Sequence, residues 1–359
     1  MNYKQLFFLF IFILVFHNPI AAQTLAHYTD VLGRLWVFDN GNFQQLEHQN
    51  FKNIQRGNDY LLYVNALGEM VWYKNGQKNV LQRAAQPQFW KASRYLLYDY
   101  SQGAVKVFFD NQKETIALGR DIQISVNDSI AAFVDYDRIM KVFYQGEKHN
   151  ITIDPVKEMV TSKSSVGYIT QAGSFFVTYN NEPSLVTNDP LNRYHIGINF
   201  AVYETQYNEF GVFDAGETKQ LDFSIPQSWT AGDNILAYVN NQGIFKVYYD
   251  GEEQELSSVP PISYQIFDNT LAYMDNMKNF HVFWRGKDYL LESYQPEKIA
   301  MFEGIVAYYD NYKQLKAFYE GEQIVVSRDI PNDFEVQGKV ILYQLGNKDY
   351  RVFFKGKNY

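Results

Sequence analysis

A spacing of thirty-five residues runs through almost the whole chain. Steps of thirty-five from Tyr28 give Tyr63, Tyr98, Phe133, Tyr168, Tyr203, Tyr238, Tyr273, Tyr308 and Tyr343, so nine of the ten positions are Tyr. No insertion or deletion breaks this count. A chain of this kind is one supersecondary unit repeated ten times, and the repeat must be recognised before any motif is interpreted.

A second column with the same period marks a tight turn. It runs Gly41, Gly76, Asn111, Gly146, Asn181, Gly216, Gly251, Gly286, Gly321 and Gly356. Both exceptions are Asn, the non-glycine residue that best tolerates a positive φ. We therefore expect a left-handed backbone here in every repeat, as tight β-hairpin turns require. β-Branched and aromatic residues such as Val247 and Tyr248 precede the turn, and an apolar residue such as Leu256 follows it, which predicts a strand on each side.

Two further strands complete the predicted unit. The Tyr column closes short apolar runs such as 235–238, and polar turn clusters separate these runs from a fourth apolar column. That column contains Ile54, Phe89, Ile124, Met159, Tyr194, Trp229, Tyr264, Ile299 and Phe334. No stretch after the N-terminus has the 3.6-residue period of a helix. Each unit is therefore predicted to be up to four short antiparallel strands. Because the chain stops just after Gly356, the last unit is predicted to lack its third strand, the one that returns from the glycine turn.

A small sheet that is apolar on both faces needs neighbours, and radial stacking of four-stranded sheets is the β-propeller solution. On these repeats the sequence resembles β-propeller repeat proteins in general over residues 25–359, without the signature of a named propeller family. The resemblance implies an all-β propeller of ten 35-residue repeats. We expect a single ring, because no linker interrupts the phase of the repeats. Two five-bladed rings and an open β-solenoid are the alternatives.

The first residues have the pattern of a secretory signal peptide. Lys4 gives a positive start, residues 6–16 are an unbroken apolar run, and Ala21 and Ala22 offer a small-residue cleavage site. The expected organisation is a signal peptide over 1–22 and a β-propeller-like repeat domain over 23–359. The apolar run is too short to span a bilayer comfortably, so we expect no membrane span after signal removal. Export predicts a periplasmic, outer-envelope or secreted location.

Composition excludes several kinds of chemistry. The chain has no Cys, which rules out disulfides, thiolate nucleophiles and Cys-ligated metals. Its formal net charge of −8 comes without a Lys/Arg run, which argues against a nucleic-acid partner. None of the six His is spaced as a zinc pair, and no nucleophile elbow or phosphate-binding loop occurs. We therefore predict no catalytic, cofactor-binding or metal-binding residues from motifs.

Three repeated columns are predicted to serve the scaffold. The Tyr column is expected to pack at the strand centre, with its hydroxyl bonded at the blade interface. A basic column eight residues after the Tyr is expected to lay its aliphatic stem over the aromatic two residues later; the alternative is a positive ring for an anionic ligand. An acidic or amide column two residues after the Tyr is expected to cap its own turn. The basic column contains Lys106, Lys141, Lys246, His281, Lys316 and Arg351, and the acidic or amide column contains Asp30, Asn65, Asp135, Asn240, Asp275 and Asp310.

Two matching Asp-Pro pairs, 154–155 and 189–190, break the equivalence of the repeats. They lie thirty-five residues apart in adjacent units, so their loops are predicted to emerge at the same end of the ring. Ligand sites are departures from a scaffold. Asp154 and Asp189, with Arg193 and His195 in the second connection, are therefore predicted as partner-binding loops. Drift in one weak blade is the alternative.

The chain consists of repeated scaffold and contains no catalytic or ligand-binding motif. This favours a non-catalytic binding or scaffold protein of the bacterial cell envelope or exterior. Its partner would be an unknown protein or glycan. The alternative is a secreted glycan-active enzyme with carboxylates at the propeller channel. Such an enzyme would have two carboxylates roughly 5–10 Å apart in one cleft, with at least one in an environment that raises its pKa. The sequence indicates no cofactor and leaves the oligomeric state open.

Overall fold

The computed structural model describes residues 25–57, 60–82, 89–91, 96–99, 103–109, 112–119, 122–127 and 130–359. The predicted signal peptide and the turn at Asn111 lie outside these residues. Within the described ranges the regular structure is β-strand throughout, with no helix. The strands form ten antiparallel sheets, each a meander of consecutive strands; nine sheets have four strands and the first has three.

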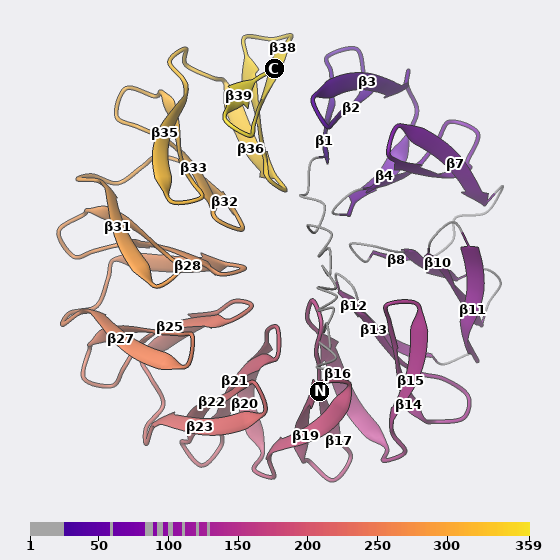
Figure 1. The fold of residues 1–359 in the computed structure, drawn as a ribbon, viewed down its shortest axis with the longest axis vertical. Coiled ribbons are helices and arrows are strands. Elements are labelled where there is room, and N and C mark those ends of the chain that lie inside the picture. The colour runs from indigo at the N-terminus through magenta and orange to yellow at the C-terminus, as the bar shows by residue number, and fades with distance from the viewer. Residues whose placement is uncertain are drawn as a thin grey trace, which may run out of the picture.

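Each sheet is a blade of a ring, and its first strand lies nearest the ring centre where the blade has four strands (Figure 1). The innermost strands are β4 (Lys52–Arg56), β8 (Phe89–Lys91), β12 (Gln123–Asn127), β16 (Val156–Thr161), β20 (Leu191–Ile196), β24 (Ser228–Ala231), β28 (Ser263–Phe267), β32 (Ile299–Phe302) and β36 (Asp333–Gln337). The second strands are β1 (Leu25–Thr29), β5 (Tyr60–Val64), β9 (Leu96–Asp99), β13 (Ile130–Val134), β17 (Val166–Thr170), β21 (Phe200–Thr205), β25 (Ile235–Val239), β29 (Thr270–Met274), β33 (Ile305–Tyr309) and β37 (Val340–Leu345). The third strands are β2 (Leu35–Asp39), β6 (Met70–Lys74), β10 (Ala104–Phe109), β14 (Met140–Tyr144), β18 (Phe175–Tyr179), β22 (Phe210–Asp214), β26 (Phe245–Tyr249), β30 (Phe280–Trp284), β34 (Leu315–Tyr319) and β38 (Asp349–Phe354). The outermost strands are β3 (Asn42–Glu47), β7 (Gln77–Gln82), β11 (Gln112–Leu118), β15 (Glu147–Thr152), β19 (Glu182–Thr187), β23 (Glu217–Asp222), β27 (Glu252–Ser257), β31 (Lys287–Glu292), β35 (Glu322–Ser327) and β39 (Lys357–Asn358).

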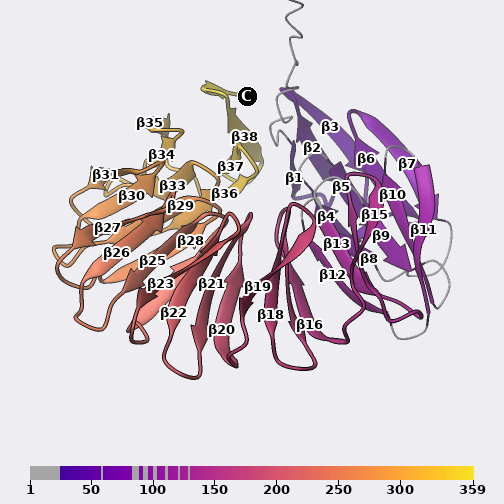
Figure 2. The same cartoon turned by 60° about the horizontal axis from the view of Figure 1, so that its bottom comes forward.

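The ten blades stand in one ring, and neighbouring sheets face each other around it (Figures 1 and 2). This arrangement confirms the single ring of ten repeats and overturns the two five-bladed rings and the open solenoid. The strand β25 shows why the sheets need this packing. All five of its residues are buried, because a blade covers each face of the sheet, whereas the outermost strand β27 is largely exposed.

Side chains join the first blade to the last, because the sheets are not closed by a strand shared between the two chain ends. The rings of Tyr28 and Tyr350 stack at 4.1 Å. The Gln337 side chain accepts a hydrogen bond from the backbone nitrogen of His27 and donates one to its carbonyl oxygen, both at 2.9 Å. The seam thus joins the first and last blades by side-chain stacking and hydrogen bonds, without a shared strand.

The prediction that the last unit lacks its third strand was wrong. After the turn at Gly356, β39 pairs with β38, and Tyr359 exchanges backbone hydrogen bonds with Val352. Three residues beyond the turn are thus enough to return to the sheet. The incomplete blade is the first one, which has no innermost strand among the described residues.

The glycine column is confirmed as a column of left-handed turns. Its described members have φ from 63° at Asn181 to 104° at Gly321. The residue before each of them is also left-handed, with φ between 48° and 52°. Two consecutive positive φ values define a type I′ turn, whose twist matches that of the two strands it joins.

The described side chains of the column from Tyr63 onward are buried, and six of the Tyr hydroxyls are hydrogen-bonded, which confirms the packing role for these members. Tyr63 donates to Glu47 at 2.7 Å and Tyr308 donates to Glu292 at 3.0 Å, in both cases to the preceding blade. Tyr273 instead donates to Asp288 of its own blade at 2.9 Å. In these three cases the hydroxyl finds an acidic partner on an outermost strand, of its own blade or of the preceding one.

Candidate functional site

Every four-stranded blade presents its turns at two opposite ends of the ring, because its strands alternate in direction. One end carries the turns between second and third strands and the connections from blade to blade. We call it the capped-turn end. The other end carries the turns between first and second strands and the type I′ turns, and we call it the glycine-turn end.

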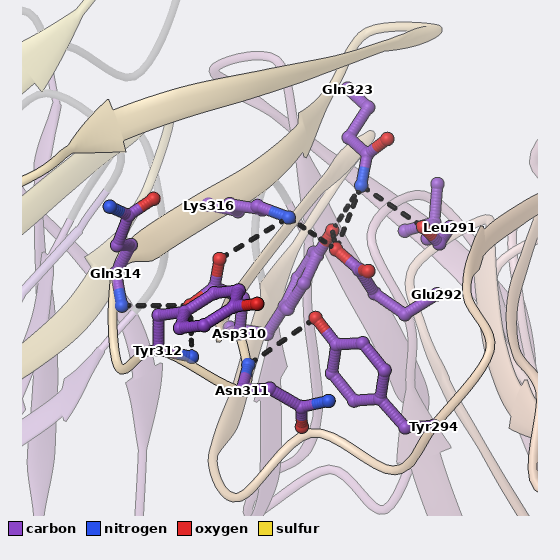
Figure 3. Close-up of polar contacts among 10 residues, drawn as sticks. Leu291, Glu292, Tyr294, Asp310, Asn311, Tyr312, Gln314, Lys316 and Gln323 are labelled. Carbon is purple, nitrogen blue, oxygen red and sulfur yellow. Dashed lines mark hydrogen bonds and ion pairs between the residues drawn. The ribbon is translucent and has the colours of Figure 1, made fainter.

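Side-chain oxygens hold the turns at the capped-turn end. Asp310 Oδ1 accepts from the backbone nitrogens of Tyr312 at 2.8 Å and Gln314 at 2.9 Å (Figure 3). The same two bonds, at 2.7 to 3.0 Å, are made by Asp30, Asn65, Asn240 and Asp275. The predicted capping role is thus confirmed for these members. Because the cap satisfies the backbone, the side chain at the tip of the turn is not needed to hold it.

Two members of the basic column form ion pairs with members of the acidic column. Lys316 Nζ lies 3.3 Å from Asp310 and 2.9 Å from Glu292 of the preceding blade (Figure 3). Lys141 likewise lies 3.0 Å from Asp135. These charges are neutralised inside the scaffold, so they do not form an open positive ring for an anionic ligand.

The prediction that the basic column covers the aromatic residue two positions later was wrong. His281 stacks on Tyr273 at 4.8 Å, and Lys246 Nζ lies 5.9 Å from the ring of Tyr238. Both rings belong to the Tyr column and lie directly across the sheet from the basic residue. Directly paired residues on neighbouring strands are closer than residues two apart on one strand, so the pairing register decides the contact.

Large apolar side chains gather at the capped-turn end. Nine of those in the described residues are between 57% and 89% exposed and lie in its turns and connections: Leu32, Leu67, Tyr136, Ile153, Tyr207, Phe223, Met277, Tyr312 and Ile330. Single exposed apolar residues are normal on a protein surface. Their concentration at one end of the ring marks a candidate interaction surface, which we call the apolar end surface.

The two Asp-Pro pairs lie at the same end, as predicted. Asp154 is in the connection between β15 and β16, and Asp189 is in the connection between β19 and β20. The carbonyl oxygens of Pro155 and Pro190 each accept a backbone hydrogen bond at 2.8 Å, from Gln171 and Gln206 in the next turn along the chain. The pairs therefore have equivalent surroundings in adjacent blades, next to the apolar end surface.

Arg193 and His195 do not join the Asp-Pro pairs. Both are on β20 and contact the neighbouring innermost strand or its turn. The Arg193 guanidinium lies 3.8 Å from the Trp229 ring, and His195 Nε2 lies 3.1 Å from the carbonyl oxygen of Gly232 at the glycine-turn end. Burial lowers the pKa of His195, and the charge of Arg193 adds to this effect. Arg193 is exposed and His195 is half-buried, and their contacts link the inner strands of neighbouring blades.

A groove of about 680 Å³ opens at the glycine-turn end between the sixth and seventh blades. Its lining combines carboxylates, amides, one ammonium group and two Tyr side chains: Asp214, Ala215, Glu217, Lys219, Asn234, Tyr248, Tyr249, Asp250, Gly251 and Asn269.

One departure from the repeat lies in the wall of the groove. In seven of the other blades the residue two positions before the turn Gly or Asn is aromatic, and Tyr179, Tyr249 and Trp284 each lie within 4 Å of where a Cβ on the turn glycine of the next blade would be. Trp284, for example, lies 3.2 Å from where a Cβ on Gly321 would be. In the sixth blade this residue is Asp214, and no atom lies within 4 Å of a Cβ on Gly251. Asp214 Oδ2 instead accepts from the hydroxyl of Tyr248 at 2.9 Å.

A half-buried charge cluster lies beside this groove. Lys163, in the turn of the fifth blade, reaches Asp233 at 2.7 Å and Asp268 at 2.6 Å in the turns of the seventh and eighth blades. Burial raises the pKa of Asp268, and the charge of Asp233 adds to this, because two carboxylates share one ammonium group. Burial alone would lower the pKa of Lys163, but the charges of Asp268 and Asp233 outweigh it and raise that pKa. The cluster ties these three blades together at their inner turns.

The sequence contained signals for both surfaces that motif analysis missed. The turn tip lies four residues after the Tyr column, and that position holds Leu32, Leu67, Tyr207, Met277 and Tyr312. Asp214 stands where most repeats have an aromatic residue, two positions before the turn glycine, and this difference can also be seen in the sequence. Neither could be assigned to a surface before the two ends of the ring were known.

The part of the chain that the structure describes contains no group of three or more His, Cys, Asp or Glu side chains placed to hold a metal ion. It also contains no helix long and apolar enough to cross a membrane.

Comparison with known proteins gives a family match and distant structural resemblances. No curated protein sequence matches the chain. The computationally designed Ika8 protein has 13% identity and a TM-score of 0.32, over 74% of this chain and 95% of its own. PorZ, described as an essential bacterial surface component of the type-IX secretion system of Porphyromonas gingivalis, has 9% identity and a TM-score of 0.30, over 93% and 58%. BamB from Moraxella catarrhalis has 12% identity and a TM-score of 0.29, over 76% and 95%. The sequence matches the family described as a 10-bladed beta propeller domain over residues 20–359.

Proposed function

The chain belongs to the 10-bladed β-propeller domain family, and from this premise we propose that it is a non-catalytic binding protein of the cell envelope or exterior. The apolar end surface is its docking site, and its partner is a protein. The observation that carries the proposal is the exposure of nine large apolar side chains at one end of the ring. Contact with a partner would remove this apolar surface from water, which is favourable in free energy.

The repeated polar side chains support this assignment because they are used within the scaffold. The Tyr, basic and acidic columns bond to one another within the scaffold, as Lys316 does with Asp310 and Glu292. The residues that vary from blade to blade are the tips and connections at the capped-turn end. Partner recognition would therefore depend on these tips and on the neighbouring Asp154 and Asp189 connections.

Charge favours a protein over a lipid surface as the occupant. The formal net charge of the chain is −8, and membrane surfaces that carry anionic lipids repel acidic proteins. A protein partner can place its own apolar side chains between the tips. The predicted signal peptide over 1–22 supports the proposed location.

Affinity capture from an envelope extract tests the proposal. The Tyr207→Ser, Phe223→Ser double variant removes two tips of the sixth blade, and Leu290→Ser is the matched control, because Leu290 is 60% exposed on the outermost strand β31. A protein captured by wild type and control is expected to fall at least about tenfold in the double variant. Equal capture by all three, or binding of wild type to lipid vesicles in place of a protein, would overturn the proposal.

The Asp-Pro connections make a finer claim about the same surface. An Asp154→Ala, Asp189→Ala variant removes one carboxylate next to Ile153, which is highly exposed, and the equivalent carboxylate in the adjacent connection. We expect this variant to bind the captured protein several-fold more weakly. Unchanged affinity would confine the contact to the apolar tips.

A secreted glycan-active enzyme is the second candidate function, and the Asp233–Asp268 pair is the observation that favours it. The two carboxylates are close, and the pKa of Asp268 is raised by burial. One ammonium group bridges both of them, however, and an acid–base pair would have to release Lys163 before acting. Release of reducing ends from a glycan by wild type, lost in Asp268→Asn, would establish the enzyme and refute the non-catalytic proposal.

A further inference from the structure

The groove at the glycine-turn end lies opposite the apolar end surface, so its role is independent of the docking function proposed above. Asp214 stands in place of an aromatic residue beside the open turn at Gly251, and the groove there has a volume of about 680 Å³. Small-molecule sites in proteins have volumes of roughly 300–1,000 Å³. The groove is therefore large enough to hold a ligand.

The charges of the lining exclude two classes of ligand. Three carboxylates, those of Asp214, Glu217 and Asp250, face one ammonium group, that of Lys219. Lys219 Nζ itself donates to the carbonyl oxygen of Gly251 at 3.3 Å, so an anion would meet net repulsion. A divalent cation would need several oxygens converging on one point, and the described residues contain no such group.

We propose that this groove binds a neutral oligosaccharide. Sugar hydroxyls donate and accept hydrogen bonds, and the lining offers carboxylates that accept together with the side-chain amides of Asn234 and Asn269, which do both. The Tyr249 side chain adds an aromatic surface for the apolar face of a sugar ring.

The inner wall of the groove is fixed before a ligand arrives. The backbone nitrogen of Asn234 donates to Asn269 Oδ1 at 2.7 Å, which links the turns of the seventh and eighth blades. The residues just before them, Asp233 and Asp268, both contact Lys163. A site whose side chains are already held loses less conformational entropy on binding.

A second position in the ring supplies a matched control. Asp39, five repeats before Asp214, also replaces the aromatic and also accepts from a Tyr hydroxyl, that of Tyr73 at 3.1 Å. No atom lies within 4 Å of a Cβ on Gly76, the glycine of the next turn. The lining of the groove, however, differs from the residues around Asp39. Lys74 stands where the seventh blade has Tyr249, and Gln44 stands where the sixth blade has Lys219.

An oligosaccharide array followed by calorimetry tests the proposal. The array carries neutral and acidic oligosaccharides, and spermine is titrated separately. Wild type is expected to bind neutral oligosaccharides. Asp214→Tyr, which restores the aromatic cover, is expected to weaken that binding at least about tenfold, whereas Asp39→Tyr keeps it within about twofold.

A second variant and a folding control keep the test decisive. Glu217→Ala alters an exposed side chain of the lining and is expected to weaken binding several-fold without changing the melting temperature. No binding of any neutral oligosaccharide would overturn the proposal. So would binding restricted to acidic sugars or spermine, or equal affinity of wild type, Asp214→Tyr and Glu217→Ala. None of these results bears on protein capture at the apolar end surface.

Discussion

The two ends of the ring are built from the same repeat but tolerate variation differently. At the capped-turn end an Asp or Asn side chain bonds the turn from inside, as Asp310 does. At the glycine-turn end the backbone itself must be left-handed, and an aromatic residue of the preceding blade often covers the turn, as Trp284 covers Gly321.

This difference decides where function can be added to the scaffold. A capped turn keeps its shape whatever residue stands at its tip, so apolar side chains can vary from blade to blade. A covered glycine turn changes only when its cover is lost, as at Asp214, and the change then leaves a groove and not a protrusion. The capped-turn end is thus suited to a broad contact, and the glycine-turn end to an enclosed ligand.

The largest expected effect is on the glycine turns. Gly321→Val combines a φ of 104° with a Cβ 3.2 Å from Trp284, and should lower the free energy of unfolding by about 3 kcal/mol. Gly251→Val meets open space and should cost about 1 to 2 kcal/mol from backbone strain alone. Glu252→Val, at an exposed strand position, should stay within about 0.5 kcal/mol. Urea unfolding measures all three, and identical midpoints for Gly251→Val and Glu252→Val would refute the assigned strain.

At the capped-turn end the cap itself should be the sensitive residue. Asp310→Ala removes the acceptor of two backbone hydrogen bonds and a partner of Lys316, and should cost about 2 kcal/mol. Asp310→Asn keeps the acceptor and loses only the charge, so its cost should be less than half as large. If the two variants unfold alike, the ion pair and not the cap stabilises the turn.

A smaller effect depends on pH and belongs to one capped turn. Burial lowers the pKa of His281, but its hydrogen bond with Asp288 and the charges of Asp288 and Asp275 outweigh this and raise the pKa above 6.5. A raised pKa contributes stability that is complete below pH 6.5 and is lost as the pH rises through the raised value.

His281→Lys should remove this dependence, because lysine stays charged across that range. Relative to the variant, wild type should lose up to about 1 kcal/mol as the pH rises above 6.5, a value discounted for solvent screening at this partly exposed site. Melting curves recorded across this range would show the difference. Parallel pH profiles for wild type and variant would show that the His281 contacts add no stability.

The smallest effect should come from the tips. Tyr312 is 79% exposed, so Tyr312→Ser should change the free energy of unfolding by no more than about 0.5 kcal/mol. The same variant should reduce capture of the protein partner. A loss of stability comparable to that of Asp310→Ala would mean that the tip belongs to the scaffold.

The sequence was enough to predict the features that depend on local backbone geometry. The ten repeats, the left-handed turn at positions such as Gly251, and the caps such as Asp310 each follow from a few neighbouring residues. Features that depend on pairing register or ring curvature could not be predicted. The contact of His281 with Tyr273 needs the register of β29 and β30. The contacts of Lys163 with two distant turns need the curvature of the ring.

The candidate sites were only partly predictable for the same reason. Asp154 and Asp189 were correctly predicted to lie at the same end as each other, because their connections are equivalent in adjacent blades. Arg193 and His195 follow closely in sequence, but a strand carries them away from that end. Leu67 and Tyr312 occupy the same position of the thirty-five-residue repeat, which the sequence shows. Only the fold shows that both are exposed at one end of the ring.

Hydroxyl-radical footprinting in the presence of envelope extract tests the central claim most directly. Met277, Tyr312 and Phe223 report on the apolar end surface, whereas Leu290 on an outermost strand and Tyr249 in the groove report on other surfaces. We predict that the extract slows oxidation of the three apolar end residues and leaves Leu290 unchanged. Equal oxidation of all three with and without extract, or protection of Leu290 alone, would contradict the assignment of this end as the docking surface.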